Sequence, residues 1–347
     1  MKSKIILNAV CSSLLIASAF LAGTTSSFAQ DEELYPISDS RIYGYINQQG
    51  TVVIKPQFDY AEKFSEGLAH VKAAGSRGFI DKTGKFAIEP VFEKVFGFSE
   101  GLAAVKKGEK WGYIDKKGIF IIKPQFDFAY GFSQGLARIQ QGDQFGFIDK
   151  SGTLVITPKF DAAYDFQEGL ARVKQGSFKE GKWGYIDKTG NVLIGFKFDD
   201  SFDFAEGLAN VRIGDEQSGK WGFIDKTGQF VIEPQFDRAY AFSDGMSIIR
   251  IGPFRTGKYG YIDKKGQIVI NPQFWGAYNF SEGLACVKDS EEGKWGYIDK
   301  TGKTVIDLQF DIPDDFHGGL SYVRVGNYKT GTIGYINKTG KFVWKQM

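Results

Sequence analysis

Apolar residues fall into three short runs within a segment that recurs along the chain. Residues 101–105, 111–115 and 119–122 each read as a β-strand, and the breaks between them are short and polar. The break at 115–118 is a turn, since Asp bonds local backbone N–H groups and Gly accepts a positive φ. Pro124 ends the third run because proline cannot donate to a sheet ladder. The pattern predicts a three-stranded antiparallel meander followed by a connection carrying Phe126, Asp127, Ala129 and Phe132.

Two kinds of glycine mark the repetition. The first kind lies in a Lys-Trp-Gly-Tyr-Ile-Asp-Lys-x-Gly element and comprises Gly44, Gly78, Gly112, Gly146, Gly184, Gly222, Gly260, Gly296 and Gly334. The second lies in a Phe-Ser-Glu-Gly-Leu-Ala element and comprises Gly67, Gly101, Gly135, Gly169, Gly207, Gly245, Gly283 and Gly319. From first to second kind the spacing is always 23 residues, whereas from second to first it is 11, 11, 11, 15, 15, 15, 13 and 15. The constant part is therefore framework, and the variable part is a surface loop.

The predicted strands are apolar on both faces, as Leu102 and Ala104 point one way and Ala103 and Val105 the other. A sheet with two apolar faces has to be covered twice. In a repeat protein the sheets before and after provide that cover. The sequence therefore predicts an all-β fold of small sheets stacked face to face, as a propeller-like ring or an open superhelix, and leaves closure open.

The N-terminus has the pattern of a secretory signal peptide over residues 1–29. Lys2 and Lys4 precede an uncharged apolar run at 5–22, and Ser27-Phe28-Ala29 is a small-x-small cleavage pattern. An uncleaved membrane anchor is the alternative. We assign 30–40 to a polar lead-in and 41–347 to a single repeat domain with eight full units. A partial unit at 41–54 precedes them with two strands.

Charge and cysteine content narrow the range of possible functions. Removing Lys2 and Lys4 from 43 basic residues leaves 41, equal to the 41 acidic ones, so the mature chain lacks the basic excess of a nucleic-acid binder. No apolar stretch after 5–22 is long enough to span a bilayer. If the signal peptide is removed, Cys286 is the only cysteine left, so the mature chain cannot form an internal disulfide. Cys286 lies in an apolar strand pattern, which predicts a small core residue.

Both repeated elements resemble the bacterial WG repeat, also called the KWG repeat, over residues 41–345. The resemblance implies a β-rich repeat scaffold and does not imply any catalytic residues. The hairpin alone is also weakly similar to choline-binding cell-wall repeats. Departures from the motif include Arg77 at the position of the tryptophan, which argues against one ligand bound identically by every copy.

Recurrent acidic residues invite a metal or catalytic interpretation. One series precedes Lys-x-Gly (Asp81, Asp115, Asp149, Asp187, Asp225, Asp263, Asp299), a second follows Phe (Asp59, Asp127, Asp161, Asp199, Asp237, Asp311) and a third precedes the second glycine (Glu66, Glu100, Glu168, Glu206, Glu282). One carboxylate per turn cannot supply the six or more oxygens of a calcium site. The two histidines, His70 and His317, lie at non-equivalent positions, so neither a triad nor a zinc site is supported. We predict no cofactor, no metal and no catalytic residue, with the carboxylates bonding backbone N–H groups.

The variable loops carry the candidate binding residues. Three of the four longest contain an aromatic residue followed by a basic one, a common pairing at recognition surfaces. These are Phe178 with Lys179, Phe254 with Arg255, and Tyr328 with Lys329; the fourth, 214–217, has neither. The competing interpretation is that each ring packs over its own hairpin.

The sequence thus favours a non-enzymatic extracytoplasmic protein that binds a protein or an envelope polymer through repeat loops. One alternative is a cell-wall or glycan-binding protein, suggested by export and an aromatic content of 16%. A second is a propeller-type hydrolase, which predicts one asymmetric pocket with unpaired carboxylates that breaks the regularity of the repeat. Oligomeric state is left open.

Overall fold

The computed structural model describes residues 32–39, 41–177, 179–327 and 329–346. The described residues form 34 strands in nine antiparallel sheets, and they contain no helix that could span a membrane. The predicted signal segment and Cys11 lie outside the described residues. We call the sheets blades 1 to 9 in chain order.

The strand bounds show how regular the repetition is. Blades 1 to 3 consist of β1 (Tyr35–Asp39), β2 (Ile42–Ile46) and β3 (Val52–Phe58); β4 (Tyr60–Ala61), β5 (Ala69–Ala73), β6 (Ser76–Ile80) and β7 (Phe86–Phe92); and β8 (Lys94–Val95), β9 (Ala103–Lys107), β10 (Lys110–Ile114) and β11 (Phe120–Phe126). Blades 4 to 6 consist of β12 (Phe128–Ser133), β13 (Leu136–Gln141), β14 (Gln144–Ile148) and β15 (Leu154–Phe160); β16 (Ala162–Ala163), β17 (Ala171–Gln175), β18 (Lys182–Ile186) and β19 (Val192–Phe198); and β20 (Asp200–Ser201), β21 (Ala209–Ile213), β22 (Lys220–Ile224) and β23 (Phe230–Phe236). Blades 7 to 9 consist of β24 (Arg238–Ala239), β25 (Ser247–Ile251), β26 (Lys258–Ile262) and β27 (Ile268–Phe274); β28 (Gly276–Ala277), β29 (Leu284–Lys288), β30 (Trp295–Asp299) and β31 (Thr304–Phe310); and β32 (Leu320–Val325), β33 (Thr332–Asn337) and β34 (Phe342–Lys345).

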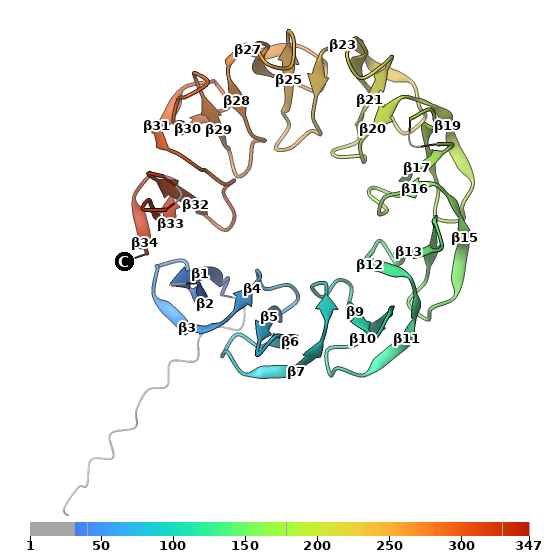
Figure 1. Cartoon of the computed structure of the whole chain (residues 1–347). Coiled ribbons are helices and arrows are strands. Elements are labelled where there is room, and N and C mark those ends of the chain that lie inside the picture. The colour runs from blue at the N-terminus through green and yellow to red at the C-terminus, as the bar shows by residue number, and fades with distance from the viewer. Residues whose placement is uncertain (1–31, 40, 178, 328, 347) are drawn as a thin grey trace, which may run out of the picture. The chain divides into compact units, whose positions relative to one another are not determined.

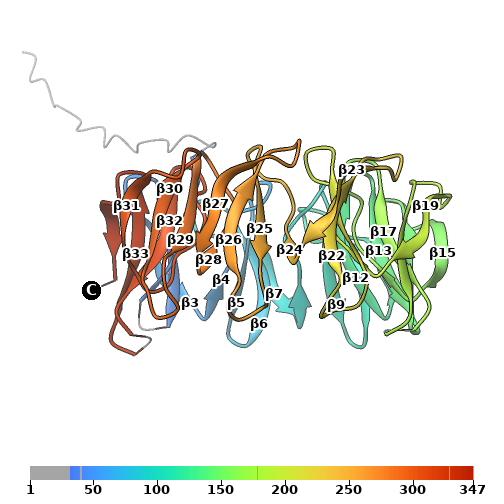
Figure 2. The same cartoon turned by 90° about the horizontal axis from the view of Figure 1, so that it is seen from above.

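The blades stand around a ring, with the long last strands such as β7 and β11 on the outside and the short first strands nearer the middle (Figure 1). Seen from above, the blades form a band of even height (Figure 2). Side chains of adjacent blades interlock into successive apolar clusters. One, for example, joins Ala104, Trp111 and Tyr113 of blade 3 to Ala129 and Ile139 of blade 4. The prediction of an all-β fold of stacked sheets is confirmed, and the arrangement is a nine-bladed β-propeller.

Two local details differ from the sequence prediction. Seven blades have a fourth, short strand, because residues after the Phe-Asp pair turn back and pair with the next strand, as Ala61 does with Val71. Pro124 does not end the third strand, since β11 continues to Phe126 through a bulge in its pairing with β10. A proline is tolerated in a bulge because the ladder hydrogen bond is already missing there.

The predicted lead-in is part of the fold. Tyr35–Asp39 forms β1, which pairs with β2 in the place expected to lack a strand. Leu34, Tyr35 and Ile37 are buried, so the apolar residues of this short segment outweigh its acidic flank. The repeat domain therefore begins earlier than residue 41, and blade 1 has three strands rather than two.

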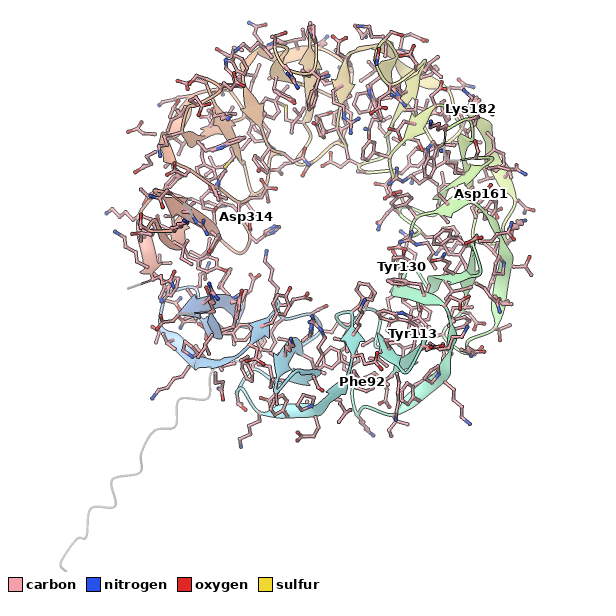
Figure 3. All side chains as sticks on the ribbon, in the orientation of Figure 1. Phe92, Tyr113, Tyr130, Asp161, Lys182 and Asp314 are labelled. Carbon is pink, nitrogen blue, oxygen red and sulfur yellow. The ribbon has the colours of Figure 1, made fainter. Side chains whose placement is uncertain are left out.

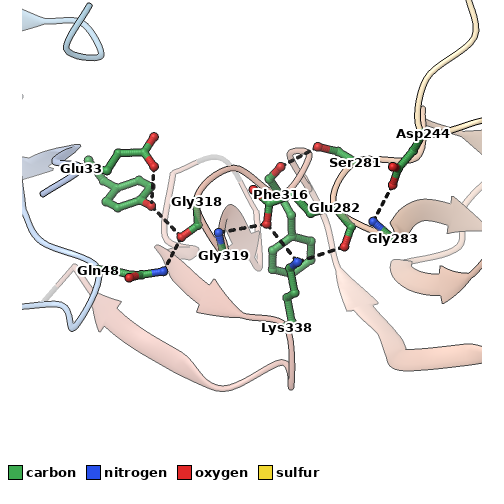
Figure 4. A network of polar contacts seen from close by, with 11 residues as sticks. Glu33, Gln48, Asp244, Ser281, Glu282, Gly283, Phe316, Gly318, Gly319 and Lys338 are labelled. Atoms are coloured by element: carbon green, nitrogen blue, oxygen red, sulfur yellow. Dashed lines mark hydrogen bonds and ion pairs between the residues drawn. The ribbon is translucent and has the colours of Figure 1, made fainter. Parts of the chain in front are cut away.

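Blades 1 and 9 close the ring by packing, without strand exchange. Tyr35, Ile37 and Ile46 of blade 1 form one apolar cluster with Leu320 and Tyr335 of blade 9. The Tyr335 hydroxyl donates to the Pro36 carbonyl at 2.9 Å. In addition, the Tyr35 hydroxyl and Gln48 Nε2 donate to the Gly318 carbonyl at 2.8 and 2.6 Å (Figure 4).

The glutamate series links neighbouring blades. Glu282 of blade 8 accepts from the Gly319 N–H of blade 9 at 3.0 Å and lies 3.0 Å from Lys338 Nζ, and Asp244 accepts from the Gly283 N–H in the same way (Figure 4). These acidic residues adopt a positive φ, 52° at Glu282, which side chains rarely tolerate. The bridge to the next blade holds that conformation, so this series is structural, as predicted.

The glycine of the Trp-Gly element allows a close approach of two backbones at the bulge. A Cβ on Gly222 would lie 2.5 Å from the Ile232 carbonyl oxygen and 2.7 Å from the Pro234 nitrogen. We expect Gly222→Ala to destabilise the protein by about 1–3 kcal/mol, the usual cost of overpacking. Gly195→Ala in β19 is the matched control, because a Cβ there meets nothing within 4 Å. Thermal unfolding followed by circular dichroism distinguishes the two, and equal melting temperatures would contradict the bulge explanation.

Candidate binding site

The three aromatic-basic loops are hairpin loops at equivalent positions, β17–β18, β25–β26 and β32–β33, so they lie on one face of the ring. Lys179, Arg255 and Lys329 are exposed, and Phe254 keeps 80% of its surface exposed with its ring centroid 5.4 Å from the Arg250 guanidinium carbon. Phe178 and Tyr328 lie outside the described residues.

The backbone of these loops is fixed by groups other than the aromatic residues. In each loop an aspartate of the Phe-Asp series accepts a hydrogen bond from the backbone N–H of the first loop glycine. Asp237 Oδ2, for example, accepts from the Gly252 N–H at 2.7 Å. The loop at 214–219, which has no aromatic residue, closes alike, with the Gly219 N–H donating to the Asp215 carbonyl at 2.9 Å, as Gly257 does to Pro253. The scaffold of the loop thus leaves its tip free to vary.

This independence gives a prediction. We expect Phe178→Ala, Phe254→Ala and Tyr328→Ala, singly or together, to change the melting temperature by roughly 2 °C or less, because exposed substitutions cost within about 0.5 kcal/mol. Thermal unfolding checks this. A loss of several degrees for each variant would show that the rings pack on their own hairpins.

The turn carboxylates and His70 have structural partners. Asp115 Oδ1 accepts the backbone N–H groups of Lys117 and Ile119, both at 2.9 Å, which confirms the turn interpretation. His70 is buried, with Nδ1 3.2 Å from Glu62 Oε2. Within the described part of the chain, no three His, Cys, Asp or Glu side chains gather closely enough to hold a metal ion.

A row of aromatic side chains follows the short first strands near the middle of the ring. We call it the inner row: Phe96, Tyr130, Tyr164, Phe202, Tyr240 and Tyr278. Tyr130 lies beside the open centre in Figure 3, and Asp314, the equivalent residue of blade 9, lies there as well. Tyr164 and Tyr278 keep 38% and 40% of their surfaces exposed. The inner row therefore presents ring faces that are only half buried.

Buried arginines fill the gaps between members of the inner row in two places. Between blades 4 and 5, the guanidinium carbon of Arg138 lies 3.5 Å from the Tyr130 ring centroid and 5.2 Å from that of Tyr164. Arg138 Nε lies 3.1 Å from Asp165 Oδ1, and a second nitrogen donates to the Ala163 carbonyl. Two of the three guanidinium nitrogens are thus paired, and the guanidinium carbon lies over an aromatic ring.

The gap between blades 5 and 6 is filled in the same way. The Arg172 guanidinium carbon lies 3.5 Å from the Tyr164 ring centroid and 5.1 Å from that of Phe202. Its Nε forms an ion pair with Asp203 Oδ1 at 2.9 Å, and a second nitrogen donates a hydrogen bond to the Ser201 carbonyl. The two gaps form one type of site, which we call the arginine slot.

Between blades 7 and 8 the equivalent slot has no arginine. Ile248 occupies the position of Arg138 and Arg172, since it pairs with Tyr261 as Arg138 pairs with Phe147. A pocket of about 460 Å³ opens here. It is lined by residues of blades 7, 8 and 9, namely Tyr240, Ile248, Tyr259, Trp275, Gly276, Ala277, Tyr278, Asn279, Lys288, Trp295 and Asp315. Its volume falls within the range of ligand sites, and it is an open depression rather than an enclosed cavity.

Two further departures from the repeat contribute to the lining of this pocket. Trp275 replaces the acidic residue that follows phenylalanine in the other copies. Lys258 Nζ lies 3.9 Å from its ring centroid, whereas the equivalent Lys220 pairs with Asp237 at 2.6 Å. Gly276 follows, and a Cβ there would lie 2.5 Å from Trp295 Cη2, so only glycine admits that ring.

The polar groups of the pocket are perturbed by burial. Asn279 stands where Asp165 and Asp203 pair with arginine, and its Oδ1 is buried without a hydrogen-bond partner among the described residues. Burial, reinforced by Asp314, raises the pKa of Asp315. Burial also raises the pKa of Tyr278, with contributions from Cys286, Asp315 and Asp314. Within the described residues, the pocket therefore combines a buried amide oxygen that has no donor and a half-buried carboxylate with the one cation of its lining, Lys288.

The asymmetric pocket expected for a hydrolase is present in outline, but its chemistry differs. Of the carboxylates in the described residues only Asp315 lines it, and glycoside hydrolysis by paired carboxylates requires two. The sequence analysis missed this pocket and the inner row. The signal was an aromatic residue four positions after the phenylalanine in the six middle copies, Phe92 to Phe274, together with Trp275-Gly276 at the copy that has no acidic residue after that phenylalanine.

The fold and its half-buried inner row define a repeat β-propeller. The chain belongs to the family of WG-containing repeats, whose model matches residues 43–75, 78–111, 111–144, 145–177, 183–216, 221–252, 259–294 and 295–328. A search of curated proteins found no match.

Solved structures with a related arrangement include Hsv2 from Kluyveromyces lactis, at 11% identity and a TM-score of 0.41, covering 78% of this chain and 95% of that one. Oligopeptidase B from Trypanosoma brucei is similar at 9% identity and a TM-score of 0.44, covering 88% of this chain and 53% of that one. At this level of similarity, function has to be argued from the residues of this chain.

Proposed function

We propose that this propeller is an exported, non-catalytic scaffold that binds a protein partner on the ring face formed by its hairpin loops. The observation that carries the proposal is the exposure of Phe254 and its basic neighbour on a loop whose backbone is held independently of them. An exposed aromatic ring beside a cation is a common anchor in protein interfaces. The signal-like segment at 1–29 supports an extracytoplasmic location.

A second argument comes from the ring itself. Neighbouring blades are joined by apolar clusters and by glutamate bridges, so the loops are presented from a rigid frame. A rigid frame lowers the entropic cost of binding, because little has to be ordered when the partner arrives. Loops at equivalent places on three blades also allow one partner to be contacted at several points.

Co-sedimentation of the purified protein with isolated bacterial envelope, before and after protease treatment of that envelope, tests the proposal. We expect binding that protease abolishes and that the combined Phe178→Ala, Phe254→Ala and Tyr328→Ala variant reduces at least tenfold. The matched control is Glu216→Ala in the fourth loop, which changes an exposed residue on a loop of the same build without an aromatic residue. Binding that survives protease would favour a glycan instead, and binding unaffected by the triple variant would contradict the role of the loops.

A further inference from the structure

Among the described residues, two gaps of the inner row are arginine slots, which we call occupied, and the gap between blades 7 and 8, with Ile248 in place of the arginine, we call the empty slot. In the occupied slots a planar guanidinium lies between two aromatic rings, with its guanidinium carbon 3.5 Å from the nearer ring centroid. Its nitrogens reach a backbone carbonyl, of Ala163 or Ser201, and an aspartate carboxylate. These internal contacts identify the chemical group that a slot of this geometry accepts.

The empty slot between blades 7 and 8 retains most of those features. Tyr240 and Tyr278 supply the two rings. Ala277 occupies the position of Ala163 and Ser201, whose carbonyls accept hydrogen bonds from the arginines in the occupied slots. At the next interface back, Asn210 Nδ2 donates to the equivalent Ala239 carbonyl at 2.9 Å. The same carbonyl position thus receives a side-chain donor at three successive interfaces. Ile248 cannot provide one at the fourth.

One acceptor of the empty slot lacks a donor in the described part of the chain. Asn279 Oδ1 is buried without a partner among the described residues, and it stands where an aspartate meets the guanidinium in the occupied slots. Asp315 of blade 9 adds a half-buried carboxylate to the lining. A group that only donates hydrogen bonds and carries positive charge satisfies all of these atoms at once.

We propose that the pocket between blades 7 and 8 binds a guanidinium group from outside the chain, supplied by an arginine side chain of a protein partner. Arginine fits better than lysine because a planar guanidinium stacks between two rings and offers five donors in a fixed plane, whereas an ammonium does neither. The inference rests on the proposed function only in that a partner supplies the arginine. The pocket itself is tested without that partner.

The test is titration of the purified protein with N-acetyl-arginine amide, followed by tryptophan fluorescence, since Trp275 and Trp295 line the pocket. We expect a saturable change with a Kd on the order of 1 mM, reasonable for a single side chain. N-acetyl-citrulline amide has nearly the same shape without the charge, and N-acetyl-lysine amide has the charge without the plane. Both are expected to bind at least tenfold more weakly at matched ionic strength.

Two substitutions take their design from the occupied slots. Asn279→Asp places a carboxylate at the position that Asp165 and Asp203 occupy in the occupied slots. It is expected to tighten binding of the arginine probe about tenfold. Ile248→Arg places the chain's own guanidinium in the slot and is expected to abolish binding. Val269→Arg adds the same charge to an exposed position of β27 in blade 7 and is expected to leave binding unchanged.

Three results would overturn the inference: no saturable change with the arginine probe, equal binding of the citrulline probe, or a Kd that Asn279→Asp does not lower. Because Asn279→Asp does not add bulk, it remains informative even if Ile248→Arg impairs folding. Loss of envelope binding in the triple loop variant, with arginine binding intact, would separate the loop face from the pocket. Failure of the arginine probe would likewise leave the loop proposal standing.

Discussion

Deletion of residues 32–39 is expected to open the ring and to lower the melting temperature by roughly 10 °C. The deletion removes β1 and the buried side chains of Leu34, Tyr35 and Ile37, each worth about 1.5–3 kcal/mol of stability. It also removes the contacts that join blade 1 to blade 9, including the Tyr335–Pro36 hydrogen bond. In a repeat protein stability is the sum of blade and interface contributions, so the blades beside the opening become the weakest.

Thermal unfolding measures the overall loss, and amide hydrogen exchange locates it. Protection is expected to fall in β2 and β33 and to remain in β18, which lies far from the opening in the ring. Tyr35→Ala should reproduce part of the effect, whereas Ser38→Ala, on a partly exposed position of the same strand, should not. An unchanged melting temperature in the deletion variant would restore the interpretation of this segment as a lead-in outside the domain.

Arg172→Ala is expected to destabilise the protein by about 2–4 kcal/mol at pH 7. The substitution removes a guanidinium stacked between Tyr164 and Phe202 and leaves the Ser201 carbonyl without its side-chain donor. It also leaves Asp203 without its ion-pair partner. Chemical denaturation checks the size of the loss, and Lys182→Ala, which removes an exposed ion pair with Asp199 in the same blade, serves as the control.

The loss should depend on pH in a defined direction. Burial raises the pKa of Asp203 even though Arg172 opposes the shift, so removing Arg172 raises that pKa further. A carboxyl whose pKa is higher in the folded state binds more protons there, so stability falls as pH rises from its unfolded pKa through its folded pKa. The deficit of Arg172→Ala is therefore expected to be largest at neutral pH and to shrink on acidification. Adding Asp203→Asn should remove this pH dependence, and a deficit that grows toward low pH would contradict the assignment.

The repeat explains why so much of the fold could be predicted from the sequence. Nine glycines of the first kind are spaced regularly because each lets two backbones meet at a bulge, a local requirement that is repeated in every blade. Apolar residues on both faces of the strands required a neighbour on each side, which fixed stacked sheets as the architecture. The carboxylate series likewise bond backbone N–H groups near them in the repeat, as Asp115 does.

The candidate site was only partly predictable. The hairpin loops were located because their lengths vary against a constant framework, but nothing in that pattern indicated the inner row. The arginine slots join residues of successive blades, Arg172 with Asp203 and Arg138 with Asp165, and their complementarity is visible only when the blades are placed side by side. The empty slot is recognised in turn only by comparison with the occupied ones.

The sequence by itself determined the all-β class, the repeat, the stacking of its sheets and the place of the variable loops, because these follow from local turns, strand alternation and spacing. Only the tertiary structure decided that the ring closes, that residues 35–39 complete blade 1, and that Ile248 and Asn279 leave a pocket between two tyrosines. Closure depends on the small rotation from each blade to the next, accumulated over nine copies, and no single repeat contains that quantity. The pocket depends on which side chains meet across an interface, which is a property of pairs of blades.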